Sequence, residues 1–273
     1  MQMVETQDGT ELYVKDWGHG RPVVLIHGWP LNADSWEYQA VRLAEAGYRV
    51  IAYDRRGFGR SDQPFDGYDY DTLADDLADV MAACAVQDAT LVGFSMGGGE
   101  VARYMSRHAG KNVRQAVLIS SVVPHLMQSA RNPDGVPESA IDDILSGLRM
   151  DRQGFLKDFF RVFYGQGLVL KPVSDAVLDW SWQMAMAASP RATLACAAAF
   201  ARTDFTADMA AFTVPTLIIH GTADNTVPID PTSRMAASAI PGATLLEYDG
   251  APHGLTATHA DQLFGDLSAF LSE

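Results

Sequence analysis

Short, mainly apolar runs recur along the chain, and each one is bounded by polar or turn-forming residues. Runs of this length are typical of strands that are buried on both faces of a sheet. We therefore predict strands at residues 23–26, 50–53, 90–94, 116–119, 216–220 and 244–248. Before them, Asp8 and Gly9 separate two short mixed runs and predict an antiparallel hairpin at the start of the chain.

Between these runs, apolar residues recur with helical spacing. One apolar stripe follows Asp71, a candidate N-cap. Its members fall at i, i+4, i+7, i+8 and i+11: Leu73, Leu77, Val80, Met81 and Cys84. Asp230 followed by Pro231 predicts another helix, with a cap and a proline at the first helical position. Alternating strands and helices predict an α/β fold, with a mostly parallel central sheet and helices on both faces.

The alternation stops between about residues 125 and 206, where helical patterns rich in aromatic residues and methionine follow one another. A chain of 273 residues has a suitable length for one α/β domain with an insertion. We therefore expect a single domain at 1–273 with a helical lid inserted at about 125–206. The aromatic residues of the lid could line a ligand pocket or could form only a small core of their own.

Composition and charge narrow the possible partners. Acidic residues outnumber basic ones by 34 to 20, and the net charge of −14 disfavours nucleic acid and anionic membranes as partners. Cys84 and Cys196 are too far apart for a disulfide framework or a zinc motif, so we predict two reduced core thiols. The start of the chain lacks a signal-peptide pattern, and no stretch reaches about 18 apolar residues, which favours a cytoplasmic protein.

A G-x-S-x-G motif consisting of Gly93, Ser95 and Gly97 lies between a predicted strand and a predicted helix. Strand, sharp turn and helix form the context in which such a serine is an exposed nucleophile. The glycines are needed because side chains in so tight a turn would collide with neighbouring strands. The alternative is a serine that only caps the following helix.

A serine hydroxyl becomes a good nucleophile when a base accepts its proton and a carboxylate orients that base. In this kind of fold the chain order is serine, acid, histidine. His253, in a loop between the last strand and the last helix, is the predicted base, whereas His220 is interpreted as a core histidine. Asp224 is the predicted acid, because its competitor Asp230 is interpreted as a helix cap. The alternatives are an ordinary loop histidine and an ordinary turn aspartate.

Acyl transfer also requires hydrogen-bond donors for the oxyanion, and backbone amides usually supply them. One donor is predicted at the residue after the nucleophile, Met96. The other is predicted at Trp29, in the HGWP segment that follows an early strand. Gly28 allows the chain to turn there, and the indole of Trp29 could form a wall of the pocket. The alternative is that Trp29 serves only for packing.

Five segments together carry a family resemblance: HGWP, YDRRGFGRSDQP, LVGFSMGGGEVARY, PTLIIHGTADNTVP and GAPHG. They resemble the α/β-hydrolase superfamily, and closely its cofactor-free haloperoxidases, also called perhydrolases, with their aryl esterase relatives. The resemblance runs nearly end to end and implies an α/β-hydrolase fold without a cofactor. It also implies a triad and an oxyanion hole at the positions that the residues predict: Ser95, Asp224, His253, Trp29 and Met96.

The same resemblance implies that Phe159, Phe163 and Phe200 line an acyl pocket, and that the chain could form a homo-oligomer. Within the family, perhydrolases commonly read HGWP, whereas many esterases have another residue in place of Pro30. Proline restricts the preceding residue to extended backbone angles and has no N–H of its own. We hypothesise that Pro30, at the substrate pocket, directs a backbone carbonyl toward hydrogen peroxide as it attacks the acyl group. The alternative is that it only stiffens the loop.

These features predict a serine hydrolase of short-chain or aryl esters, with water or hydrogen peroxide as acceptor and with perhydrolase activity. Two alternatives remain: a lactam hydrolase, and a ligand-binding protein that retains the triad without turnover. Epoxide and haloalkane hydrolases would need aspartate at the position of Ser95, and dienelactone-type hydrolases would need cysteine. Neither H-E-x-x-H nor a strand-linked G-x-G-x-x-G occurs, so we predict no metal and no dinucleotide cofactor.

Overall fold

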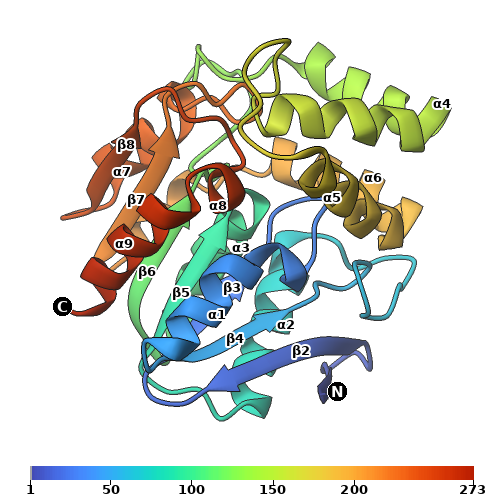
Figure 1. Ribbon diagram of the computed structural model, residues 1–273. Coiled ribbons are helices and arrows are strands. Elements are labelled where there is room, and N and C mark those ends of the chain that lie inside the picture. Colours follow the sequence, from blue (N-terminus) through green and yellow to red (C-terminus); the bar gives the residue numbers. More distant parts are fainter. Residues whose placement is uncertain (1) are drawn as a thin grey trace.

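An eight-stranded sheet forms the centre of the protein, whose computed structural model describes residues 2–273 (Figure 1). The strands follow the spatial order β1-β2-β4-β3-β5-β6-β7-β8. β1 pairs with β2 and β2 pairs with β4 in antiparallel fashion, and all other neighbours are parallel. The strands are β1 (Gln2–Glu5), β2 (Glu11–Gly18), β3 (Pro22–Ile26), β4 (Arg49–Tyr53), β5 (Ala89–Phe94), β6 (Val113–Ile119), β7 (Thr216–Gly221) and β8 (Thr244–Tyr248).

Every predicted strand lies within an observed strand, and the predicted hairpin is β1 and β2. Burial on both faces holds for the inner parallel strands β3 to β7, whose side chains are almost all inaccessible. It does not hold for β8, where Thr244 and Glu247 are exposed. β8 is the last strand of the sheet and has a neighbour on one side only, so less of it is covered.

Helices cover both faces of the sheet (Figure 1). One layer contains α1, α8 and α9, which contact one another, and the other contains α2 and α3. The predicted α/β fold, with a mostly parallel central sheet and helices on both faces, is confirmed. The helices of these layers and the segments beside them are η1 (Ala33–Trp36), α1 (Glu37–Glu45), α2 (Tyr70–Ala83), α3 (Met96–Arg107), η2 (Thr206–Ala211), η3 (Asp230–Arg234), α7 (Met235–Ala239), α8 (Leu255–Thr258) and α9 (Ala260–Leu271).

Two predicted helix caps were wrong in detail. Asp69 caps α2, because its carboxylate accepts the amide N–H of Thr72 at 3.0 Å, and Asp71 lies within the first turn. Asp230 lies within the π-helical turn that leads into α7, with Pro231 beside it as predicted, but its side chain caps no amide. Its carboxylate pairs instead with Arg234 one turn later, at 2.6 Å.

Three α-helices lie between β6 and β7 and form a layer beyond the carboxyl ends of the parallel strands (Figure 1). They are α4 (Glu138–Phe163), α5 (Asp175–Ala187) and α6 (Pro190–Arg202). α4 contacts both α5 and α6, and it bends at Asp151, whose backbone is not helical. Each of the three has buried apolar side chains, for example Leu156 on α4, Met184 on α5 and Phe200 on α6. We call this layer of helices the lid.

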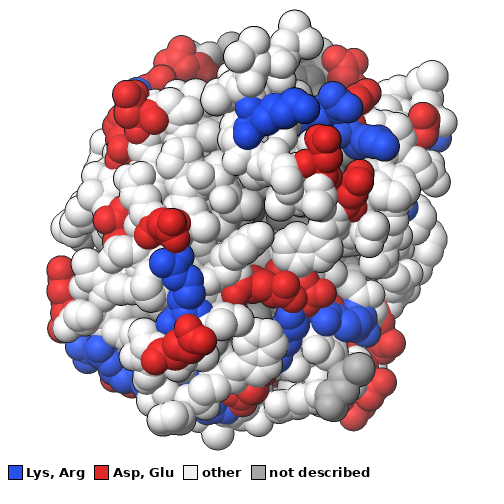
Figure 2. All heavy atoms as spheres, viewed as in Figure 1, with Lys and Arg blue, Asp and Glu red and all other residues white. Residues whose placement is uncertain are grey.

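Cys84 and Cys196 are buried free thiols, as predicted. Charged side chains are scattered over the face shown in Figure 2, with acidic and basic groups often side by side. Many of them are paired, for example Arg42 with Asp261 at 2.7 Å. Within residues 2–273, no helix combines the length and the apolar character that a bilayer span requires.

Candidate active site

Ser95 lies at the sharp turn between β5 and α3, with a φ of 55° and a ψ of −119°. A non-glycine residue rarely adopts a positive φ, so the turn is strained in the way expected of a nucleophile elbow. Its glycines are required by close backbone contacts. A Cβ at Gly93 would lie 2.5 Å from the carbonyl oxygen of Gly97, and a Cβ at Gly97 would lie 2.5 Å from that of Ile26.

The structure brings the three predicted side chains into one hydrogen-bonded line. Nε2 of His253 lies 2.9 Å from Oγ of Ser95, and Nδ1 lies 2.6 Å from Oδ2 of Asp224. All three residues are buried. A carboxylate only accepts hydrogen bonds, so Nδ1 of His253 donates to Asp224 and Nε2 is free to accept the serine proton.

Asp224 is held by four hydrogen-bond donors. Its Oδ1 accepts the amide N–H groups of Thr226 at 2.9 Å and of Val227 at 2.8 Å. Its Oδ2 faces His253 and also Nε2 of His220, 3.1 Å away. Burial alone would raise the pKa of Asp224. The charge of His253 and the hydrogen bonds from both histidines outweigh burial, and they hold this pKa well below its ordinary value.

The loop that contains Trp29 lies directly against the nucleophile. A Cβ at Gly28 would lie 3.1 Å from Cβ of Ser95, so only glycine fits there without displacement. Among the described residues, neither the amide of Trp29 nor that of Met96 donates to another protein group. Both N–H groups are therefore available to a ligand oxygen beside Ser95.

A small cavity of about 50 Å³ adjoins Ser95 and His253, and its other walls are mainly apolar. Phe159 and Phe200 line it as predicted, and both rings pack against the indole of Trp29, with centroid distances of 5.2 and 5.6 Å. Four aliphatic residues of the wall were not predicted, because no local pattern distinguishes a wall residue from a residue of the lid core: Leu126, Val136, Ile141 and Ile144.

Two residues predicted at the pocket do not line the cavity. Phe163 is fully buried, and its ring packs edge-on against the imidazole of His253 at 4.8 Å. Phe163 therefore contacts His253 through packing and does not contribute to the cavity wall. Pro30 is buried as well, and the peptide bond between Trp29 and Pro30 is cis.

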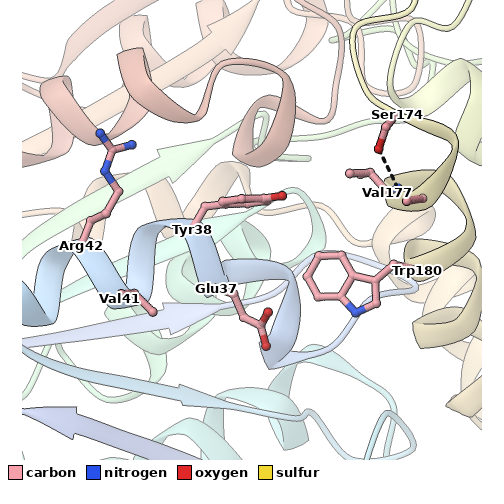
Figure 3. A pocket seen from close by; sticks show the side chains of 8 residues that line it. Glu37, Tyr38, Val41, Arg42, Ser174, Val177 and Trp180 are labelled. Carbon is pink, nitrogen blue, oxygen red and sulfur yellow. Dashed lines mark hydrogen bonds between the residues drawn. The ribbon is translucent and has the colours of Figure 1, made fainter.

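A larger hollow lies on the surface between α1 and α5 (Figure 3), with a volume of about 600 Å³. Tyr38 and Trp180 project toward it from opposite sides. The hydroxyl of Ser174, which is part of its rim, caps α5 by accepting the amide of Val177. Ser95, Asp224 and His253 do not line this hollow, whereas Ser95 and His253 line the smaller cavity. We therefore take the smaller cavity as the candidate active site. Within residues 2–273, no three His, Cys, Asp or Glu side chains are arranged to hold a metal ion.

His220 was predicted to be a core histidine, and its surroundings agree with that interpretation. It is fully buried, with Nδ1 2.6 Å from Oγ of Ser233 and Nε2 2.8 Å from the carbonyl oxygen of Val227. Its contact with Asp224 was missed. The spacing of four residues across the end of β7, in the sequence HGTAD, was the available signal.

The strained serine turn, the strand order and the lid over the sheet edge define an α/β hydrolase. Residues 21–260 match the family described as alpha/beta hydrolase fold, and the chain belongs to this family. A non-heme chloroperoxidase of Kitasatospora aureofaciens is 45% identical, with 100% of both chains covered. A bifunctional esterase/perhydrolase of Acinetobacter calcoaceticus is 41% identical over 99% of both. The crystal structure of a bromoperoxidase from Bacillus anthracis covers 100% of this chain and 99% of its own, with 45% identity and a TM-score of 0.96.

Proposed function

We propose that the protein is a serine esterase for short-chain or aryl carboxylic esters, and that it forms peracids when hydrogen peroxide replaces water. The observation that carries this proposal is the line of hydrogen bonds from Asp224 through His253 to Ser95, which ends at a small apolar cavity. The similarity to haloperoxidases and to an esterase/perhydrolase supports the same activity.

In the first half of the reaction, His253 accepts the proton of Ser95 while the serine oxygen attacks the ester carbonyl. The developing negative charge is stabilised by the amides of Trp29 and Met96, and Asp224 stabilises the imidazolium. His253 then gives its proton to the leaving alkoxide. The alcohol departs, and the acyl group remains bonded to Ser95.

In the second half, His253 takes a proton from water or from hydrogen peroxide, and the resulting oxygen attacks the acyl carbonyl. The bond to Ser95 breaks, and the serine regains its proton from His253. Water yields a carboxylic acid, and peroxide yields a peracid. Free peracid can then oxidise halide ions in solution, away from the protein.

The cavity suits short acyl groups. One water molecule needs about 10–15 Å³, so a cavity of about 50 Å³ accepts only a few non-hydrogen atoms without movement of the lid. The apolar wall of Trp29, Phe159 and Phe200 favours an aryl or alkyl group over a charged one.

The choice between water and peroxide is assigned to Pro30. The carbonyl of Gly28 already accepts the amide of Leu31 at 3.0 Å, so this loop has a closed, defined turn. Pro30 lies within that turn and sets the direction of the neighbouring carbonyls. We expect Pro30→Leu to lower the ratio of perhydrolysis to hydrolysis, measured with p-nitrophenyl acetate and varied peroxide. An unchanged ratio would show that the proline only stiffens the loop.

Mass spectrometry of the intact protein tests the main proposal. With p-nitrophenyl acetate, one acetyl group is expected on Ser95, and added peroxide is expected to remove it faster. Ser95→Ala should abolish both the adduct and the turnover. A single burst without further turnover would favour a binding protein, and faster turnover of small lactams than of esters would favour a lactam hydrolase. The cytoplasmic location and the homo-oligomeric state that we expect from the sequence are still predictions.

A further inference from the structure

The two amides assigned to the oxyanion belong to separate segments of the chain. Trp29 lies in the loop after β3, and Met96 is the first residue of α3. Both N–H groups must lie about 2.7–3.1 Å from a single oxygen for the transition state to be stabilised. The loop and the helix therefore need a fixed position relative to each other.

The direction of the Trp29 amide is set by the carbonyl of the same peptide unit, which belongs to Gly28. That carbonyl oxygen lies 2.9 Å from Nδ1 of His27 and accepts the amide of Leu31 at 3.0 Å. A trans peptide unit is planar, with its C=O and N–H pointing in opposite directions. The two donors that hold the carbonyl of Gly28 therefore direct the N–H of Trp29 away from them.

The ring of His27 can hold this carbonyl only in one neutral form. A carbonyl accepts, so Nδ1 must carry the hydrogen, and Nε2 then accepts the amide of Arg55 at 3.0 Å. In the opposite tautomer both of these hydrogen bonds would be lost. Only a longer contact of 3.3 Å, between Nη1 of Arg55 and Nδ1 of His27, could replace them. Complete burial and the nearby charge of Arg55 lower the pKa of His27, which keeps the ring neutral.

Arg55 connects this loop to α3. Its Nη2 donates to the carbonyl of His27 at 2.8 Å, and its Nε pairs with Glu100 at 2.8 Å. Glu100 lies one helical turn after Met96, and its other oxygen accepts the hydroxyl of Tyr53. His27, Arg55 and Glu100 are all fully buried, and none of them lines the cavity.

We propose that His27, Arg55 and Glu100, here named the Arg55 cluster, position the two oxyanion amides against each other without contacting the substrate. This inference rests on the proposed esterase function. It also gives different roles to Arg55 and Arg56, the two adjacent arginines of the RRGFGR segment. Arg55 joins the two halves of the oxyanion hole, whereas Arg56 pairs with Asp76 on α2 and with Asp8 in the first hairpin.

The neighbouring arginines provide a matched pair of variants, Arg55→Lys and Arg56→Lys. Both arginines are buried and ion-paired, so both substitutions weaken a buried pair. Lysine cannot reach a carboxylate and a carbonyl with the planar geometry of arginine. We expect Arg55→Lys to lower kcat for p-nitrophenyl acetate by roughly 10- to 100-fold with little change in KM, because small displacements of catalytic groups have effects of this size. Arg56→Lys should leave kcat unchanged, although its melting temperature falls.

A second readout uses phenylboronic acid, whose tetrahedral adduct on Ser95 places an oxygen at the oxyanion position. Its inhibition constant should rise in Arg55→Lys by about the same factor as kcat falls, and it should stay constant in Arg56→Lys. His27→Leu and His27→Asn extend the test. Asparagine retains a donor near the position of Nδ1, so it should restore most of the activity that leucine removes.

The outcomes separate the inference from the proposed function. Equal losses of kcat in the two arginine variants, or full activity and normal boronate inhibition in Arg55→Lys, would overturn the role of the Arg55 cluster. If Arg55→Lys does not fold, His27→Asn against His27→Leu gives the same comparison. A wild-type protein that neither turns over the ester nor binds the boronate would instead refute the esterase assignment.

Discussion

Nε2 of His220 lies 3.1 Å from Oδ2 of Asp224, the same oxygen that faces Nδ1 of His253 at 2.6 Å. Nε2 of His220 must carry a hydrogen, because it also approaches the carbonyl oxygen of Val227 at 2.8 Å. Its N–H is therefore shared between a carbonyl and the carboxylate of the triad. Together with the two amides that donate to Oδ1, this second histidine holds the carboxylate with Oδ2 directed at His253.

Replacement of His220 should affect the reaction more than binding. We expect His220→Leu to lower kcat by roughly 10- to 100-fold while KM changes little, because Oδ2 of Asp224 loses one of the two groups that orient it, and small displacements of catalytic groups have effects of this size. Ser233→Ala is the matched control, since it removes only the partner of Nδ1. Steady-state kinetics with p-nitrophenyl acetate would measure both variants. Equal effects of the two substitutions would argue for a purely structural role of His220.

The depressed pKa of Asp224 predicts how stability depends on pH. A carboxylate whose pKa is lower in the folded state stabilises the fold above its ordinary value near 3.9, and this contribution is lost as the pH falls toward the folded-state pKa. Urea unfolding of wild type and Asp224→Asn should therefore differ most at neutral pH. The difference in free energy of unfolding should shrink below about pH 4. A constant difference across this range would contradict the assignment.

The two thiols should be unreactive in the native protein. Only a thiolate attacks a disulfide reagent, and burial raises the pKa of Cys196 to about 12 and also raises that of Cys84. With Ellman's reagent at pH 8, we expect no reaction before denaturant is added and two equivalents afterwards. Cys196→Ala should reduce the final value to one. Rapid labelling of Cys196 in the native state would show that the lid opens far more than the structure indicates, and rapid labelling of Cys84 would show the same for the end of α2.

The wall residue Ile141 should limit the length of the acyl group. Ile141→Ala enlarges the cavity, and we expect kcat/KM for p-nitrophenyl hexanoate relative to acetate to rise roughly tenfold, because one methylene group in an apolar pocket is worth about 1–3 kcal/mol. Leu145→Ala is the control, since Leu145 is buried on the same helix but does not line the cavity. Either variant should lose about 2–5 kcal/mol of stability. A similar change of chain-length preference in both variants would contradict the assigned wall.

Local pattern was enough to predict the strands and the nucleophile turn. Apolar runs identify buried strands, and the need for glycine at Gly93 and Gly97 arises from contacts within and beside one turn. The limits of such reasoning appear at helix starts. Asp69 and Asp71 lie in the same short segment, and only the backbone geometry determines which carboxylate reaches the amide of Thr72.

Chain order and chemical type also selected Ser95, Asp224 and His253 as the candidate triad, because few residues of the right kind follow the right strands. Serine and histidine are 158 residues apart, however, and only the packed sheet brings their atoms to 2.9 Å. The tertiary structure alone showed that the ring of Phe163 packs against His253 and that Arg55 joins the HGWP loop to α3. The physical reason is that strand and turn patterns reflect interactions between neighbours in the chain. The walls of the cavity and the buried ion pairs depend on how distant segments pack.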